Sequence, residues 1–159
     1  AVLLVAGLYD QTTEFFIPSY AQSLSSFQND KKSVHRIESE VPPGSMIFEL
    51  PYIPFPEGQP GGLSLFRPYL HSHQLRWSYG SLPGREGDEW VRKVAFADND
   101  LGHIVQRIIA KGFMGIYIDR QLMPEHSKVE EALSKILGIP LIESENHRQS
   151  FFSLAKVTR

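Results

Sequence analysis

Residues 101–120 read LGHIVQRIIAKGFMGIYIDR, and this stretch decides the fold class. Apolar residues recur every three or four positions in its first half, at Leu101, Ile104, Val105, Ile108 and Ile109. This spacing predicts a helix, which Asp98 or Asn99 opens and Gly112 closes. Residues 113–120 are rich in β-branched and aromatic side chains, which predicts a strand. A helix followed at once by a strand is typical of an α/β fold.

The same two patterns extend outward through the chain. Helical spacing predicts helices at residues 18–27, 30–41, 89–95 and 125–137. Asn29 or Asp30 would cap the second of these helices, and Asp88 the third. Runs of apolar residues between turn residues predict strands at residues 1–9, 45–50, 140–143 and 150–154. We therefore expect a mostly parallel central sheet with flanking helices, a long irregular insertion and a C-terminal antiparallel hairpin.

Length and composition fit one globular domain over residues 1–159, with a mass of 18.0 kDa. The net charge is −2 and the basic residues are dispersed, which argues against electrostatic binding of nucleic acid. The absence of cysteine excludes disulfides and thiol chemistry. Residues 1–8 are apolar, but crossing a bilayer takes about 20 such residues. Because the chain starts in this run without Met, we expect it to be a piece of a longer protein.

The insertion, residues 46–85, reads MIFELPYIPFPEGQPGGLSLFRPYLHSHQLRWSYGSLPGR. Its prolines predict a stiff, extended backbone after residue 50, and a helix is predicted only from Pro68 onward. Aromatic faces combined with guanidinium groups suit a sugar ring that carries an anionic group. The candidate ligand-binding residues of this segment are Glu57, Arg76, Trp77, Tyr79 and Arg85.

A structural interpretation of the same residues stays open. Trp77 could anchor the insertion in the core, and Arg76 could pair with Glu57 or Asp119. Both interpretations account equally well for this combination of aromatic and charged residues.

Two carboxylates, Asp10 and Asp119, follow predicted strands and are further candidates for the site. Acid-base catalysis would require them to converge with Glu57 in one pocket. The alternatives are that Asp10 caps a helix and that Asp119 forms a structural ion pair with its neighbour Arg120.

No glycine-rich phosphate loop, dinucleotide fingerprint, GxSxG or HExxH motif occurs in the chain, so no cofactor is predicted. His71 and His73 would share one face of a strand and could bind a metal together with Glu57. Because no third ligand lies at a diagnostic spacing, we predict no metal site and interpret the two histidines as part of a polar loop.

Several short motifs occur together along the chain. They are LPY at residues 50–52, PFPE at 54–57, LRWSYG at 75–80, GR at 84–85, Trp90, and GF with IYIDR between 112 and 120. With these motifs most of the chain resembles the C-terminal soluble region of large bacterial polytopic membrane proteins, of the glycosyltransferase-like or phosphoglycerol-transferase-like kind. The resemblance implies a domain on the extracytoplasmic (periplasmic) face of the inner membrane, tethered by preceding transmembrane helices. It implies that catalytic acids lie in the membrane part, and it assigns no catalytic residue to this chain.

Our leading hypothesis is a domain that is not catalytic in isolation and recognises sugar or lipid-linked phosphate for an envelope protein. One rival is a carboxylate-dependent hydrolase or transferase that acts on its own. The other is a purely structural module that packs against the membrane-embedded portion of its own protein or against a partner.

Overall fold

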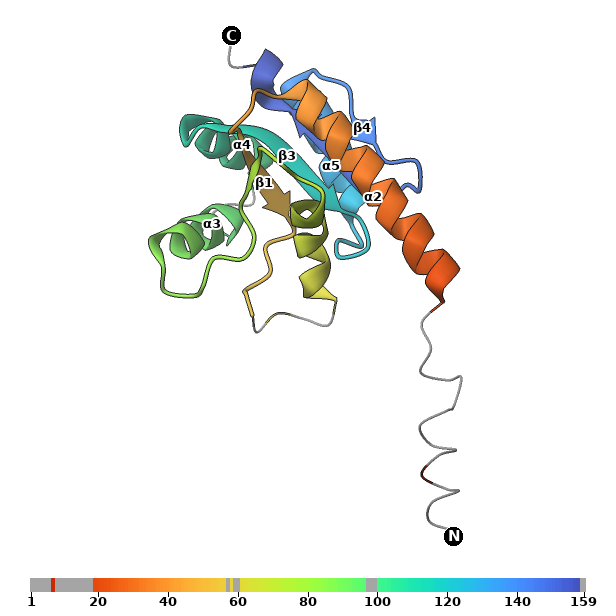
Figure 1. The fold of residues 1–159 in the computed structure, drawn as a ribbon. Coiled ribbons are helices and arrows are strands. Elements are labelled where there is room, and N and C mark those ends of the chain that lie inside the picture. Colours follow the sequence, from red (N-terminus) through yellow and green to blue (C-terminus); the bar gives the residue numbers. More distant parts are fainter. Residues whose placement is uncertain (1–6, 8–18, 57, 59–60, 97–99, 158–159) are drawn as a thin grey trace.

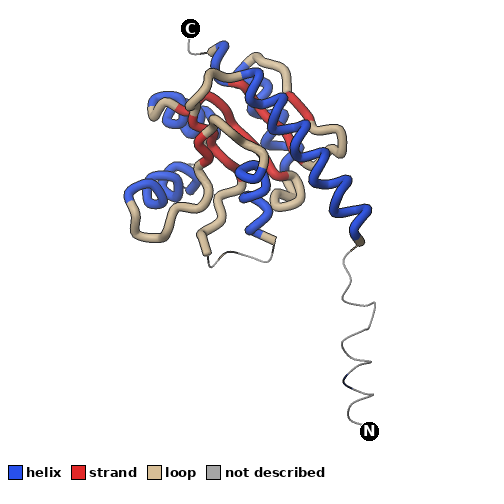
Figure 2. The backbone as a smooth tube through the Cα atoms, viewed as in Figure 1, coloured by secondary structure: helices blue, strands red, loops and turns tan. Residues whose placement is uncertain are grey.

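The computed structural model describes residues 7, 19–56, 58, 61–96 and 100–157. The described strands form one five-stranded sheet in the order β2-β1-β3-β5-β4 (Figures 1 and 2). They are β1 (Met46–Leu50), β2 (Arg76–Trp77), β3 (Phe113–Asp119), β4 (Ile142–Glu143) and β5 (Gln149–Ser153). β1 pairs parallel with β2 and β3, whereas β5 pairs antiparallel with β3 and β4. The expected α/β fold, with a mostly parallel sheet and a C-terminal antiparallel hairpin, is confirmed.

Helices cover both faces of the sheet and bury two separate cores. One face carries α2 (Tyr20–Glu40) and the 3-10 helix η2 (Gly62–Leu70). The other carries α3 (Glu86–Phe96), α4 (Leu101–Ala110) and α5 (His126–Leu137). A short 3-10 turn, η3 (Leu154–Lys156), follows β5. Figure 1 shows α2 crossing in front of the sheet.

Side chains along the central strands point alternately into the two cores. In β1, Ile47 packs toward α2, whereas its neighbour Phe48 packs toward α3 and α4. In β3, Tyr117 faces the α2 core and Ile116 the opposite one. Neighbouring side chains of a strand point to opposite faces, so strands covered on both sides become continuously apolar.

α2 is one helix of 21 residues, and the prediction of two helices in this region is wrong. Asp30 does not cap a second helix but lies buried inside α2. Its carboxylate lies 2.5 Å from the Arg67 guanidinium and accepts a hydrogen bond of 2.7 Å from Gln149 Nε2. These partners from η2 and β5 satisfy the polar side chain, so the helix continues through it.

The insertion also differs from the prediction. Its helix, η2, spans 62–70 instead of starting at Pro68, and residues 76–77, for which no strand was predicted, form the edge strand β2. Arg76 N–H donates to Ser45 O at 2.9 Å, and Ser78 N–H donates to Ile47 O at 3.0 Å. A strand of two residues is too short to give a periodic signal in the sequence.

Helix starts were predicted less accurately than helix ends. α3 begins at Glu86 instead of residue 89, and Asp88, in its first turn, accepts a hydrogen bond of 2.8 Å from the Tyr52 hydroxyl. Asp100 caps α4 by accepting from Gly102 N–H at 2.8 Å. The expected caps at 98 and 99 lie outside the described residues, as do the expected first strand, apart from residue 7, and Asp10.

Candidate functional site

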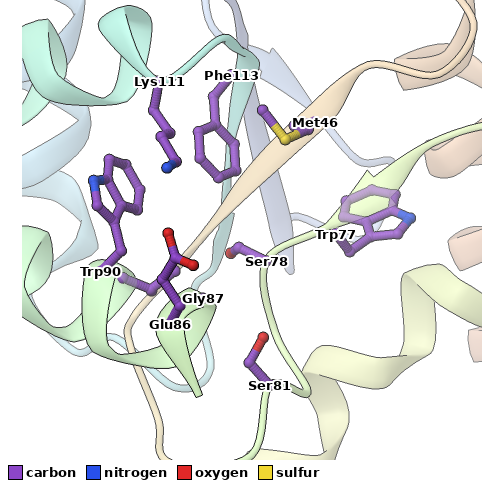
Figure 3. Close-up of a pocket in the computed structure, with 10 residues that line it drawn as sticks. Met46, Trp77, Ser78, Ser81, Glu86, Gly87, Trp90, Lys111 and Phe113 are labelled. Carbon is purple, nitrogen blue, oxygen red and sulfur yellow. The ribbon is translucent and has the colours of Figure 1, made fainter. Parts of the chain in front are cut away.

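A pocket of about 270 Å³ lies between α3 and the β2 edge of the sheet, and we call it the α3 pocket (Figure 3). The strands contribute the starts of β1 and β3, and α3 contributes its first two turns. The residues that line it are Met46, Trp77, Ser78, Ser81, Glu86, Gly87, Trp90, Val91, Lys111 and Phe113. The pocket therefore draws on four separate parts of the chain.

One wall of the α3 pocket is aromatic and rigid. The Trp90 ring stacks on Phe113 with 5.6 Å between centroids and 12° between planes. Phe48 supports both rings edge-on, at 6.3 Å from Trp90 and 5.5 Å from Phe113. Trp90 is half-buried, so the stack fixes its ring while part of its surface stays open.

Polar groups converge on the same space. Lys111 Nζ lies 5.6 Å from the centroid of the Trp90 ring, within the range of a cation-π contact. Figure 3 shows the Glu86 carboxylate and the hydroxyls of Ser78 and Ser81 turned toward the space that Lys111 also faces. A cation, a carboxylate, two hydroxyls and an indole thus surround one small volume.

Local structure explains how the lysine reaches this pocket. Lys111 is the C-cap residue of α4, and Gly112 follows with a φ of +92°. Glycine adopts this left-handed conformation without strain, so the chain turns directly from α4 into β3. The turn places Lys111 beside Phe113 and across from Trp90 on α3.

Trp77 is the only described residue of the predicted site that lines the α3 pocket, and most of it is buried. Its ring packs edge-on against Tyr117 at 5.6 Å and lies 6.4 Å from Tyr69. In Figure 3 the indole nitrogen lies on the side away from Lys111. Trp77 therefore acts chiefly as a core residue of the α2 face, in line with the structural interpretation.

The other aromatic and basic candidates lie apart from this pocket. Arg76 is exposed, and its Nε donates to Gly44 O at 2.9 Å; of its two expected partners, Asp119 contacts Arg148 instead, and Glu57 lies outside the described residues. Tyr79 is buried against Phe66, with 4.8 Å between ring centroids. Arg85 is exposed in the turn before α3. The structure does not bring these side chains together.

Asp119 is fully buried at the end of β3. Its carboxylate accepts hydrogen bonds from Ser64 Oγ at 2.9 Å and from Gln121 N–H at 3.0 Å, and Arg148 Nη2 lies 3.4 Å away. The proposed ion pair with Arg120 is wrong. Arg120 pairs instead with Glu130 at 2.7 Å, because successive residues at the strand end point in opposite directions.

The remaining candidates are two carboxylates and the two histidines that were considered as metal ligands. Glu57 and Asp10 lie outside the described residues. His71 is buried against Phe27, with 4.4 Å between ring centroids, whereas His73 is exposed. The two imidazoles therefore do not share a face. Within the described part of the chain, no three His, Asp or Glu side chains are grouped as metal ligands.

Glu49 was not recognised as a candidate from the sequence, although it is the one acidic residue in the run MIFEL. It is buried in β1, and its Oε2 accepts a hydrogen bond of 2.8 Å from the Tyr79 N–H. Burial raises the pKa of its carboxyl from 4.5 to about 8. An acidic residue inside an apolar strand was the signal that could have identified it.

A second pocket, of about 370 Å³, lies between α2 and η2. It contains the Asp30–Arg67 pair, which neutralises its own charge, and His71. Burial lowers the pKa of His71, which favours the neutral imidazole. The α3 pocket offers an aromatic wall together with a lysine, and is the stronger candidate for a charged ligand.

No protein-family model, curated protein or solved structure matches the chain. The resemblance to the membrane-bound envelope proteins therefore remains a prediction. None of the described helices combines the length and the apolar composition that crossing a bilayer requires.

Proposed function

We propose that this chain is a ligand-recognition domain of a bacterial envelope protein, and that the α3 pocket binds a sugar phosphate or the sugar of a lipid-linked phosphate. The observation that carries the proposal is the convergence of Lys111, Glu86 and two serine hydroxyls beside the Trp90 ring. Indole faces bind the apolar side of a sugar ring, and ammonium groups bind phosphate oxygens.

Each group has a separate role in this proposal. The open side of Trp90 packs against the sugar ring, and Lys111 neutralises the phosphate. The Glu86 carboxylate accepts hydrogen bonds from sugar hydroxyls, and the hydroxyls of Ser78 and Ser81 donate to them or accept from them. The volume, about 270 Å³, is close to the lower end of ligand pockets and suits one monosaccharide unit.

The proposed role is recognition, with any transfer chemistry in the membrane-embedded portion of the same protein. The described strand-end carboxylate, Asp119, is fully buried and engaged by Ser64, Gln121 and Arg148, which favours a structural role over acid-base catalysis. The proposed setting is the extracytoplasmic face of the bacterial inner membrane, as the sequence resemblance implies.

Titration of the chain with glucose 1-phosphate tests the proposed ligand class, with tryptophan fluorescence and calorimetry as readouts. We expect saturable binding that weakens by about 10-fold in Lys111→Gln, because one charge-assisted contact is lost. Lys93→Gln is the matched control, since Lys93 is an exposed residue of α3 paired with Glu89. Absence of saturation up to millimolar ligand, or equal losses in both variants, would overturn the proposal.

The membrane setting has its own test. The coding sequence upstream of Ala1 should encode several hydrophobic spans of about 20 residues each. A reporter enzyme that is active only outside the cytoplasm, fused after Arg159 in the natural protein, should then be active. An inactive reporter would indicate that the C-terminus lies in the cytoplasm, which would contradict the proposed location.

A further inference from the structure

A small cavity, distinct from the pocket between α2 and η2, adjoins the α3 pocket. Its volume is about 10 Å³, and Glu49, Tyr52, Ser81 and Val91 are among the residues that line it. A cavity of this size accommodates about one water-sized group. We call it the inner cavity.

Glu49 is one of the residues that line the inner cavity, and one oxygen of its carboxyl is already engaged. Its Oε2 accepts the hydrogen bond from the Tyr79 N–H, at 2.8 Å. Its Oε1 is buried and has no hydrogen-bond partner among the described residues. Leaving a buried polar atom unpaired costs about 1 to 3 kcal/mol, so this oxygen gains from a partner that a ligand supplies.

The charges around Glu49 determine which hydrogen bond it makes. Burial raises its pKa to about 8, the Asp119 carboxylate also raises it, and the backbone N–H groups of Tyr79 and Ser78 lower it by less. Among the described residues, the hydroxyls of Tyr69, Tyr79 and Tyr117 also interact with it. Since Oε2 is an acceptor, the proton retained at neutral pH lies on Oε1 and makes it a donor.

The inner cavity and the α3 pocket have a common boundary. Ser78, Ser81 and Val91 line both of them. Ser78 Oγ also accepts a hydrogen bond of 2.8 Å from the Glu49 N–H, which holds this boundary directly against β1. A ligand in the α3 pocket therefore lies one layer of side chains from Glu49.

We propose that the inner cavity is a subsite of the α3 pocket, in which Glu49 Oε1 donates a hydrogen bond to one oxygen of the bound sugar phosphate. The subsite rests on the proposed function, because it requires the ligand to occupy the α3 pocket. Small displacements of the Ser78 and Ser81 side chains admit the oxygen. Glu49 then selects ligands that present an acceptor at this depth.

The test compares Glu49→Gln, which keeps a donor at all pH values, with Glu49→Met, which is unbranched and has none. Glucose 1-phosphate is titrated into each variant and the wild type at pH 7 and pH 9. Wild-type affinity should fall by about 10-fold at pH 9, one unit above the pKa of Glu49. The affinity ratio between the two pH values should approach one in Glu49→Gln. Glu49→Met should bind about 5-fold to 10-fold more weakly at pH 7, since one hydrogen bond is lost.

Each outcome has a defined meaning. No saturation in the wild type overturns both the proposed function and the subsite. If the wild type binds and Glu49→Met binds equally well at pH 7, the subsite fails while the proposed function stands. A pH dependence retained in Glu49→Gln also overturns the subsite. Circular dichroism confirms that each variant is folded, and Glu131→Gln, at an exposed position of α5, controls for loss of a carboxylate.

Discussion

The carboxylate of Glu49 in β1 accepts a hydrogen bond of 2.8 Å from the backbone N–H of Tyr79, 30 residues further along the chain. This contact joins the second-last residue of β1 to the segment that leaves β2. The same carboxyl is buried and senses the charge of Asp119, while the backbone N–H of Glu49 donates to Ser78 Oγ, a residue that lines the α3 pocket. One acidic residue thus links the sheet, the edge strand and the candidate site.

The raised pKa of Glu49 predicts that stability falls as pH rises. Between pH 4.5 and about 8 the folded carboxyl keeps a proton that the unfolded chain has released. Raising the pH through this window therefore lowers the free energy of unfolding, by roughly 1 to 2 kcal/mol between pH 7 and 9. Urea unfolding at these two pH values measures the change.

Glu49→Gln should remove most of this slope, because glutamine resembles the protonated carboxyl at every pH. The variant should therefore be more stable than the wild type at pH 9. Glu131→Gln should keep the wild-type slope between pH 7 and 9, since its carboxyl is exposed and its pKa is lowered by Lys135. Equal slopes in the wild type and Glu49→Gln would show that Glu49 does not titrate in this range.

Arg120 should be essential to stability, unlike the charged pairs on the surface. Its guanidinium forms a two-pronged contact with Glu130, at 2.7 and 3.0 Å, and also contacts Glu143. Glu130 is buried, so Arg120→Ala removes the guanidinium that neutralises its carboxylate and leaves only Ser150 and His126 beside it; the loss should cost about 3 to 5 kcal/mol in the free energy of unfolding. Chemical denaturation gives the value.

Lys128→Ala is the matched control for this loss. Its partner Glu125 lies 3.1 Å away and both side chains are mostly exposed, so the cost should stay below about 1 kcal/mol. The loss of stability in Arg120→Lys should lie between those of Arg120→Ala and Lys128→Ala, because an ammonium cannot reproduce the two parallel contacts. A cost for Arg120→Ala as small as that for Lys128→Ala would contradict the structural role.

Sequence patterns predicted the elements that short-range periodicity defines. β3, α4 and α5 lie within about two residues of their expected bounds, because caps, glycines and apolar spacing are local signals. α2 was divided at Asp30, since the partners that satisfy this residue, Arg67 and Gln149, come from distant elements.

The α3 pocket could not be assembled from sequence for the same reason. Trp90 and Glu86 belong to α3 and Lys111 follows the end of α4, and the packing of these two helices against each other has no local signature. Density of aromatic residues favoured Trp77, but density does not distinguish a buried indole from an exposed one. The predicted ion pair between Asp119 and Arg120 relied on their being adjacent in sequence. Adjacent residues at a strand end point to opposite faces, and the two side chains have different partners.

Gly115 should tolerate no side chain in the middle of β3. An added Cβ would overlap the Phe151 ring and lie 3.2 Å from Ile47 Cδ1. Gly115→Ala should therefore lower the free energy of unfolding by roughly 1 to 3 kcal/mol through overpacking. Phe151→Leu in the same chain should recover part of this loss, because it makes room for the methyl group. A double-mutant cycle measures the coupling, and additive losses would mean that the ring is not the obstacle.

Substitution of the two tryptophans should have different effects on stability and on ligand binding. Trp77 is 7% exposed and packs on Tyr117, so Trp77→Ala should lower the free energy of unfolding by about 3 to 5 kcal/mol. Trp90 is half-buried, so Trp90→Ala should destabilise less while weakening glucose 1-phosphate binding, because the proposed platform for the sugar ring is lost. Urea unfolding and ligand titration of both variants give the two measurements. If Trp77→Ala stays stable but loses binding and Trp90→Ala keeps it, the recognition surface lies on the insertion instead of at α3.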